Sequence, residues 1–354
     1  MVTSEQVARL AGVSRATVSR ALNGSPRVSA EARKRIQEAI ASLGYEPDVV
    51  AQSLVRQRSR TIALCLFYGD RKSTVFSSFG ETQHYFYLDM LRDVEQEIAA
   101  AHYDLLLPSS PYAQKNYVRS LQMRHVAGII AVAMNPADAR IKALLEAAIP
   151  TVFIDSISQG KNSTYVTSDN LEGSRQATEH LIQLGHQRIV TLISGTDGPI
   201  GSARLTGYRQ ALQQAGLPID DQLIYPSGWN TEEAYQTTLT LLQERQPRDF
   251  TAIVAGSDLM AIGVLRALHQ HGLRVPGDVS VVGFDDVNLC RYTEPPLTTI
   301  RQNRAAMVQA AVQRLISMIE SEDEQHASGL PPIITPIELV MRESTGPVTL
   351  PDQA

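Results

Sequence analysis

Residues 12–24, with the sequence GVSRATVSRALNG, carry side chains of the types that contact nucleic acids. Their apolar residues recur at helical spacing and predict a helix with one buried face, formed by Val13, Val18 and Leu22. The stretch also holds Arg15 and Arg20, together with small hydroxyl residues, and contains no acidic residue to pair with the arginines. Arginines and hydroxyls make many of the contacts to phosphates and base edges in DNA complexes. The stretch is therefore a candidate nucleic-acid-binding helix.

Acidic residues follow several apolar runs that are predicted to be strands. The residues at these positions are Asp155, Ser257 with Asp258, and Asp285 with Asp286. In open parallel sheets, ligands bind at the carboxyl ends of the strands. One such residue alone is better explained as the N-cap of the next helix. Several carboxylates beside an arginine instead favour a polar pocket for a hydroxylated ligand, because carboxylates accept hydrogen bonds from hydroxyls and a guanidinium donates to them.

Two further residues belong with these carboxylates. Arg204 is expected in a loop after another strand, and it is the arginine that would donate to a ligand. Trp229, the only tryptophan, lies in SGWNTEEAY, a polar connection between a strand and a helix. Its indole either anchors the core or offers a flat face to the C–H side of a sugar ring.

Length and charge limit the kinds of protein that the sequence encodes. The 354 residues are too many for one core, so two or three domains are expected. Residues 1–60 hold ten Lys/Arg and five Asp/Glu, whereas the remainder holds 22 and 32. A basic head on an acidic body indicates that the head alone meets a polyanion.

Several function classes are disfavoured by the sequence. The longest apolar runs are too short to span a bilayer, and the chain does not begin with a secretory signal. Cys65 and Cys290 fit buried free thiols, so a cytoplasmic protein with no membrane association is expected. We find no GxGxxG motif after the first strand, and no P-loop, HExxH or GxSxG motif. We therefore expect no enzymatic activity, no cofactor and no metal site.

Residues 1–46 are predicted to form three short helices. Their hydroxyl N-caps and glycine stops set limits at 4–11, about 15–22 and about 30–43, with the caps Thr3, Ser14 and Ser29. In the first helix, Val7 and Leu10 are expected to face inward. Two helices joined by a tight turn form a helix-turn-helix pattern. Residues 47–60 are predicted to be a linker that folds on contact with a partner.

From Thr61 onward, apolar runs alternate with amphipathic helical stretches. The runs that predict strands are 61–67, 104–110, 128–133, 151–155, 188–195, 252–258 and 279–286. This alternation favours an α/β fold with parallel sheets covered on both faces. Residues 61–345 are too many for one sheet, so two α/β subdomains with a cleft between them are expected. The chain is expected to cross between them near 163–167 and 291–302, and to end in a tail over 346–354.

Over essentially its whole length, the chain resembles the LacI/GalR family of bacterial transcription regulators. That family's helix-turn-helix and hinge are similar to SEQVARLAGVSRATVSRALNGSPRVSAEARKRIQEAIASLGYEPDVVAQSL. Its effector domain, which is of periplasmic-binding-protein-like type, is similar to SDNLEGSRQATEHLIQLGHQRI, SARLTGYRQAL, GSDLMAIGVLRAL, RVPGDVSVVGFDD and YTEPPLTTIRQN. The resemblance implies a sequence-specific regulator that binds double-stranded operator DNA. It is expected to repress carbohydrate-utilisation genes under the control of a small sugar-like effector bound between the subdomains.

The resemblance also implies which residues contact DNA. It makes residues 15–22 the recognition helix and assigns contacts to Ser14, Arg15, Ala16, Thr17, Ser19, Arg20, Asn23, Val28, Ser29 and Tyr45. Arginine side chains are expected at guanines, and the Ala16 methyl at a thymine methyl. In the hinge, Leu54 is expected to wedge into the minor groove, with Ala51 and Gln52 beside it. Asp48 stands where the family often has Asn.

For the effector, the resemblance implies contacts from Phe86, Tyr87, Asp155, Arg204, Trp229, Ser257, Asp258, Asp285 and Gln302. The segment 68–85 is longer than the usual first loop and is expected to reshape one wall of the pocket. The chain lacks the leucine-heptad tail of tetrameric relatives, so a homodimer is expected. Two alternatives stay open: a regulator of this fold that responds to a purine or a phosphorylated metabolite, and a solute-binding protein. A solute-binding protein would need a signal peptide and would not need the head.

Substitutions in the head and in the hinge are expected to have different effects. Arg15→Ala or Arg20→Ala should relax base preference by about 1–3 kcal/mol at one position in each half-site. Leu54→Ala should weaken specific binding and DNA bending while leaving the half-site preference intact, because the wedge acts at the dyad. Binding to systematically varied duplexes and a bending assay measure both effects. A Leu54→Ala protein that binds and bends DNA like the parent would show the hinge assignment to be wrong.

Overall fold

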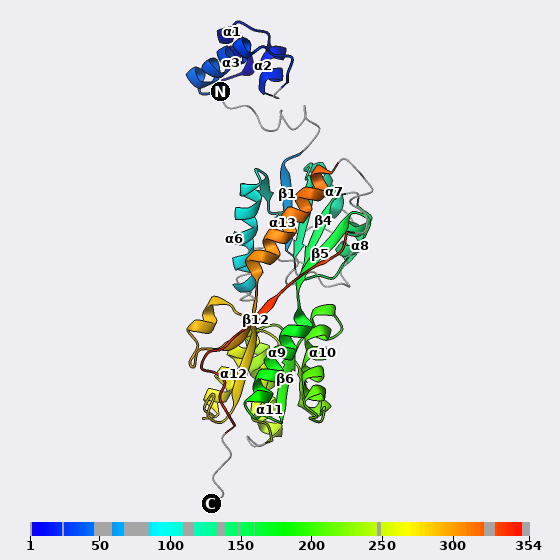
Figure 1. Ribbon diagram of the computed structural model, residues 1–354, viewed down its shortest axis with the longest axis vertical. Helices are drawn as coiled ribbons and strands as arrows, with labels where there is room; N and C mark the ends of the chain where they lie inside the picture. Colours follow the sequence, from blue (N-terminus) through cyan, green and yellow to red (C-terminus); the bar gives the residue numbers. More distant parts are fainter. Residues whose placement is uncertain are drawn as a thin grey trace, which may run out of the picture. The chain divides into compact units, whose positions relative to one another are not determined.

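The computed structural model describes residues 2–22, 25–45, 59–66, 85–108, 117–132, 139–147, 149–158, 160–245, 249–321 and 330–348 (Figure 1). The chain divides into two compact units, Met1–Arg60 and Thr61–Ala354. No helix in the described ranges is long and apolar enough to cross a membrane.

The first unit is a three-helix head, made of α1 (Ser4–Ala11), α2 (Arg15–Leu22) and α3 (Ala30–Leu43). The predicted N-cap at Thr3 is confirmed, and it forms a capping box with Gln6: the Thr3 backbone N–H donates to Gln6 Oε1 at 2.8 Å, and Thr3 Oγ1 accepts from the Gln6 backbone N–H. The hydroxyl of Ser14 accepts from the backbone N–H of Thr17 at 3.1 Å and so caps α2. These caps satisfy backbone donors that a helix start leaves without partners.

The head core is built from Val7, Val18 and Ile36, all fully buried or nearly so. The prediction that Leu10 faces inward is wrong, because its side chain is 56% exposed. The buried stripe of α1 consists instead of Val7 with two small alanines, Ala8 and Ala11. Leu10 lies beyond the edge of this stripe.

The second unit contains two six-stranded sheets, and we call the part around each sheet a lobe. In lobe 1 the strand order is β11-β5-β4-β3-β1-β2, and every pairing is parallel. The strands are β1 (Thr61–Leu66), β2 (Asp104–Leu106), β3 (Gly128–Val132), β4 (Thr151–Ile154), β5 (Ser163–Ser168) and β11 (Ile333–Thr335).

Alternation along β1 explains why helices cover both faces of the lobe 1 sheet. Ile62 and Leu64 pack with α6 (Tyr85–Ala100) and α13 (Arg304–Glu320). Ala63 and Cys65 pack on the other face with α7 (Tyr117–Met123) and α8 (Ala139–Glu146). Successive side chains of a strand point to opposite faces, so a continuous apolar run requires cover on both sides.

In lobe 2 the strand order is β12-β10-β9-β8-β6-β7, and only β12 runs antiparallel to its neighbour. The strands are β6 (Ile189–Ile193), β7 (Ile224–Pro226), β8 (Ala252–Ala255), β9 (Ser280–Asp285), β10 (Thr298–Gln302) and β12 (Ile337–Val340). One face is covered by α9 (Asn170–Gln183) and α10 (Pro199–Gln214), and the other by α11 (Thr231–Glu244) and α12 (Asp258–Gln270). The predicted α/β class with two parallel-sheet subdomains is confirmed.

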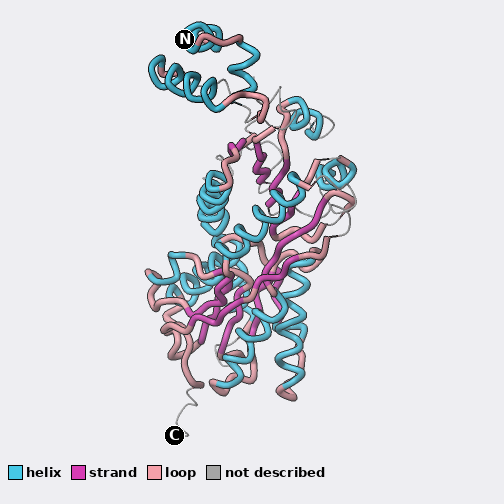
Figure 2. The backbone as a smooth tube through the Cα atoms, turned by 45° about the horizontal axis from the view of Figure 1, so that its top comes forward, coloured by secondary structure: helices cyan, strands magenta, loops and turns pink. Residues whose placement is uncertain are grey.

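The chain crosses between the lobes three times: after β5, after β10, and between β11 and β12 (Figures 1 and 2). The sequence did not predict the third crossing, because β11 and β12, with three and four residues, are too short to stand out as strands. The chain also stays attached beyond residue 345, where a tail was expected to begin. The backbone N–H of Gly346 donates to Ser280 Oγ at 3.1 Å, and that of Val348 donates to the Leu184 carbonyl at 3.0 Å.

The packing of α10 on α9 depends on a glycine. A Cβ atom added at Gly207 would lie 2.1 Å from the carbonyl oxygen of Leu171, so an alanine forces the helices apart. Gly207→Ala is expected to lower the free energy of unfolding by about 1–3 kcal/mol. Chemical denaturation measures the loss, and Ser202→Ala, on an exposed position of the same helix, is the control. Equal stability of the two variants would contradict this account of the α9–α10 contact.

Candidate functional site

The exposed surface of α2 is the first candidate site. Arg15, Ala16 and Arg20 are exposed, whereas Thr17 and Ser19 are half-buried. Within the described part of the head, neither Arg15 nor Arg20 forms an ion pair. Arg33 differs from them: its guanidinium donates to the carbonyl of Ser25 at 3.0 Å and so stabilises the segment after α2. The helix thus presents two positive charges to solvent that pair with no acidic residue in the described ranges of the head.

The other expected DNA contacts of the head divide into three groups. Val28 has a buried side chain, 7% exposed, so the contact expected for it at the start of α3 would be made by its backbone, and this contact stays a prediction. Ser29 is exposed and caps α3, accepting from the Ala32 backbone N–H at 3.2 Å, and Tyr45 packs against the head core. The remaining candidates lie outside the described residues: Asn23, Ala51, Gln52 and Leu54.

The second candidate site centres on Arg204, which is 5% exposed. It lies inside α10 rather than in the expected loop, because the helix already begins at Pro199. Its Nε donates to Asn170 Oδ1 at 2.8 Å, and its Nη1 donates to the carbonyl of Gly256. The guanidinium carbon lies 3.6 Å from the centre of the Phe284 ring and 5.4 Å from that of Trp229. These contacts fix the orientation of a buried cation.

Asp285 and Gln302 lie directly beside this guanidinium. Arg204 Nη2 is 3.7 Å from Asp285 Oδ1, and Gln302 Nε2 donates to the same oxygen at 2.7 Å. Burial raises the pKa of Asp285 to about 8, with Asp258 contributing in the same direction and Arg204 opposing. Gln302 Oε1 is buried and has no hydrogen-bond partner among the described residues. The pair therefore offers an acceptor that a ligand donor would satisfy.

Asp155 brings lobe 1 to the same cluster. It follows β4 and accepts a hydrogen bond from Thr167 Oγ1 at 3.1 Å. Burial raises the pKa of its carboxyl, and the positive charge of Arg204 opposes that shift. Both Asp155 and Asp285 have positive φ values, 51° and 123°, a conformation that residues other than glycine rarely adopt. Such strain at two facing strand ends is typical of functional sites.

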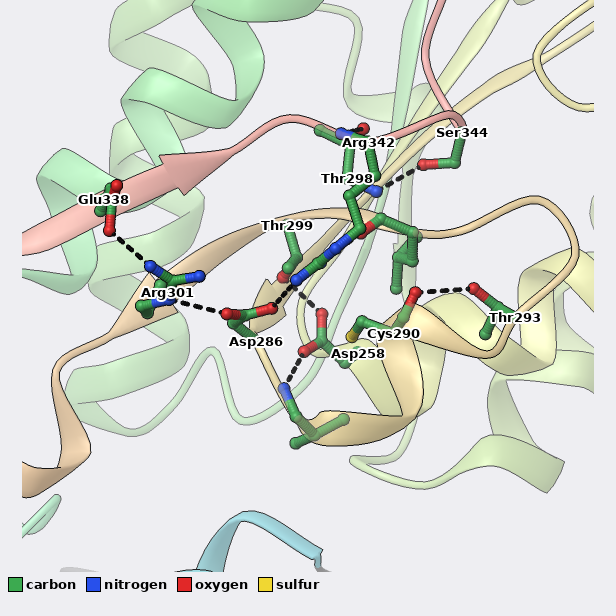
Figure 3. A network of polar contacts seen from close by, with 12 residues as sticks. Asp258, Asp286, Cys290, Thr293, Thr298, Thr299, Arg301, Glu338, Arg342 and Ser344 are labelled. Carbon is green, nitrogen blue, oxygen red and sulfur yellow. Dashed lines mark hydrogen bonds and ion pairs between the residues drawn. The ribbon is translucent and has the colours of Figure 1, made fainter.

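Asp258 does not belong to this cluster, although the sequence placed it there. It has no exposed surface, and its carboxylate accepts from the Val287 backbone N–H at 2.9 Å and from Thr299 Oγ1 at 2.5 Å (Figure 3). Ser257 is also occupied, because it caps α12 through the Met260 backbone N–H. The expectation that Asp258 faces a ligand is therefore corrected.

Asp286, the other carboxylate after β9, is also part of the scaffold. Its two oxygens accept from Arg301 Nε at 2.7 Å and from Arg342 Nη2 at 2.6 Å (Figure 3). These bonds connect the end of β9 to β10 and to the segment after β12. Of the two adjacent aspartates, Asp286 is bound to Arg301 and Arg342, whereas Asp285 lies beside Arg204.

Phe86 and Tyr87 occupy the first turn of α6. Phe86 is part of the hydrophobic core, and its ring meets that of Tyr87 edge-on with the centroids 5.3 Å apart. Tyr87 is half-buried. Residues 67–84, which include most of the long first loop, lie outside the described ranges.

Sequence reasoning missed three residues of the cluster: Thr167, Asn170 and Phe284. The sequence could have predicted Asn170, because it lies at a connection between a strand and a helix, like the aspartates expected at the site. Phe284 carried none, because a phenylalanine in an apolar strand is expected in the core. In the described part of the chain, no group of three or more His, Cys, Asp or Glu residues is arranged to hold a metal ion.

Comparison with known protein families gives two matches. Residues 4–48 match the family of bacterial regulatory proteins of the lacI type, and residues 178–345 match the periplasmic binding protein-like domain. The HTH-type transcriptional regulator CelR of Thermobifida fusca is 34% identical over 347 residues, which cover 97% of this chain and 98% of that protein.

Two solved structures are similar in fold to this protein over nearly the whole chain. A complex of the transcriptional regulator CelR with cellobiose is 31% identical with a TM-score of 0.71, covering 97% of this chain and 100% of that chain. The lac repressor dimer bound to operator and an anti-inducer is 28% identical with a TM-score of 0.78, covering 98% and 99%.

Asp285→Asn is expected to change how stability depends on pH. The pKa of Asp285 is about 8 in the folded protein, whereas an unfolded aspartate has a pKa of about 3.9. The folded state therefore binds more protons between these values, and its free energy of unfolding falls as the pH rises through them. An asparagine lacks this titration and still accepts from Gln302. The melting temperature of the variant, relative to wild type, should rise from about pH 5 to about pH 8; a constant difference would contradict the assignment.

Proposed function

We infer that this chain, which belongs to the lacI family of bacterial regulatory proteins, is a sequence-specific repressor of carbohydrate-utilisation genes that responds to a neutral sugar. It acts as a homodimer on double-stranded operator DNA, and no enzymatic activity is proposed for it. The observation that supports the effector most directly is the Arg204–Asp285 pair beside Gln302 Oε1, a buried acceptor that finds no hydrogen-bond donor in the described part of the chain.

The proposed DNA contacts follow from the exposed side of α2. Arg15, Ala16 and Arg20 meet base edges, and exposed hydroxyls such as Ser14 and Ser29 meet phosphates. Thr17, Ser19, Asn23 and Tyr45 remain in the proposal, as do the hinge residues Ala51, Gln52 and Leu54. Val28 also remains in the proposal, through its backbone beside the start of α3.

The proposed effector contacts are Asp155, Arg204, Trp229, Asp285 and Gln302, with Tyr87 at the edge. A neutral ligand is favoured because the Arg204 guanidinium is already engaged: its Nε donates to Asn170, its Nη1 donates to the Gly256 carbonyl, and its Nη2 lies 3.7 Å from Asp285 Oδ1. An anionic ligand would find few of these donors available to balance a second buried charge. Hydroxyl groups suit both sides of the cluster, since they donate to carboxylates and accept from arginine.

Selection from random duplexes tests the DNA-binding half of the proposal. A pseudo-palindrome is expected, with half-sites about one helical turn apart, because a two-fold dimer presents two heads. Affinity should fall steeply with salt, because the basic head displaces counterions. If no palindrome is enriched, operator binding by a symmetric dimer is rejected.

A ligand panel tests the effector half. Cellobiose, ribose, hypoxanthine and glucose 6-phosphate are added separately, while Trp229 fluorescence and melting temperature are recorded. Trp229 is the only tryptophan, and it lies beside Arg204, so its fluorescence reports on this site. A neutral sugar should change both signals, and Asp285→Ala should abolish that response while leaving operator binding intact. A response to hypoxanthine or the phosphorylated sugar alone would replace the sugar by that class.

A further inference from the structure

One chain of hydrogen bonds leads from Arg204 in lobe 2 to Asp155 in lobe 1. Arg204 Nε donates to Asn170 Oδ1 at 2.8 Å, Asn170 Nδ2 donates to Thr167 Oγ1 at 3.3 Å, and Thr167 Oγ1 donates to Asp155 Oδ1 at 3.1 Å. The direction is fixed by chemistry, because a guanidinium N–H and an amide N–H only donate, and the Thr167 hydroxyl that accepts from Asn170 has its own proton to donate to Asp155. Every bond therefore points the same way, from the guanidinium to the carboxyl group.

This chain of bonds follows one of the three crossings between the lobes. Thr167 belongs to β5 in the sheet of lobe 1, whereas Asn170 is the first residue of α9, which packs on the sheet of lobe 2. The second N–H of the Asn170 amide donates to the carbonyl of Ser168 at 2.9 Å. Both donors of the amide are thus used on lobe 1, and its oxygen is used on lobe 2.

Burial makes these bonds hard to exchange for water. Arg204, Asn170 and Thr167 are each 5% exposed or less. A buried polar group that loses its hydrogen-bond partner costs the full free energy of its desolvation. A displacement of Arg204 that would break one of these bonds is therefore unfavourable unless Asn170, Thr167 and Asp155 move with it. The two ends are the residues that the proposed function assigns to effector binding.

We propose that Asn170 is a positioning residue that couples effector binding at Arg204 to the orientation of lobe 1. This inference rests on the proposed function, because it assigns the coupling between the effector site and the operator-binding state. An effector that accepts a hydrogen bond from Arg204, or donates one to Asp155, competes with the bond that this residue makes within the series Arg204–Asn170–Thr167–Asp155. It thereby changes the strength of the bonds at one end of that series. The lobes then settle in a different relative orientation, which an effector can select only by binding the two orientations unequally.

Two pairs of variants separate coupling from a merely structural role. Asn170→Asp keeps an oxygen for Arg204 Nε but has no N–H to donate to Thr167 and Ser168, so it breaks the chain on the side of lobe 1 only. Thr167→Val removes the next hydroxyl. Thr164→Val is the matched control, because Thr164 is a buried threonine of the same strand whose hydroxyl donates to the Leu330 carbonyl, away from the chain.

The experiment measures both lobe orientation and coupling in the full-length protein. Spin labels at the exposed positions Lys142 in lobe 1 and Gln213 in lobe 2 report the distance between lobes, and the melting temperature verifies folding of each variant. Operator affinity is measured with and without cellobiose, or with the panel sugar that gives the largest melting shift. In wild type the sugar should change affinity by about 5- to 150-fold. In Asn170→Asp and Thr167→Val this change should shrink to within about twofold, and the distance distribution should broaden.

The outcomes distinguish this proposal from the function on which it rests. Thr164→Val should behave like wild type in both measurements. If Asn170→Asp and Thr167→Val keep the wild-type distance distribution and the wild-type response to the sugar, the positioning role is overturned while the regulator function stands. If wild type itself selects no operator, the proposed function fails, and the coupling assigned to Asn170 is rejected with it.

Discussion

The buried guanidinium of Arg204 is the constraint around which the effector-binding half of the molecule is organised. A charge removed from water is tolerated only when fixed partners replace its hydration. Here the partners come from three different elements: the first turn of α9, the residue that follows β8, and the end of β9, which supplies both Asp285 and the aromatic ring of Phe284. Each strand of lobe 2 that contributes must therefore end at the same depth, and the parallel register of β8 and β9 ensures this.

The two carboxylates after β9 show how neighbouring residues take separate roles. Asp286 is held between two arginines, which joins β9 to β10 and to the segment after β12. Asp285 is held by one amide and lies beyond hydrogen-bonding distance of Arg204. A strained backbone at both positions turns the side chains to different sides of the sheet end. Asp286, which is fixed by its two arginines, thereby holds the backbone of Asp285 in place, and the carboxyl group of Asp285 remains available to a ligand.

The fold was largely predictable, since continuous apolar strands alternating with amphipathic helices leave few alternatives. Individual side chains at strand ends were not. Asp258 and Asp285 both follow an apolar strand in the sequence. Asp258 nevertheless points into the interior, where it accepts hydrogen bonds from the Val287 backbone N–H and from the side chains of Thr299 and Cys290. Such partners come from residues some 30 to 40 positions away, which local periodicity cannot reveal. The same reason applies to Val28 and Leu10, because the burial of Val28 and the exposure of Leu10 depend on the packing of other helices in the head.

The three crossings between the lobes have a consequence for synthesis of the chain on the ribosome. Lobe 1 is assembled from residues before α9 and from α13 and β11, which are made only after all but the last strand of lobe 2. Until α13 emerges, the face of β1 that carries Ile62 and Leu64 lacks one of its two covering helices. The nascent first half therefore exposes apolar strand surface until late in translation, and such surface makes a folding intermediate prone to aggregation. The late helix closes the early sheet, so neither lobe can be obtained by cutting the gene at one point.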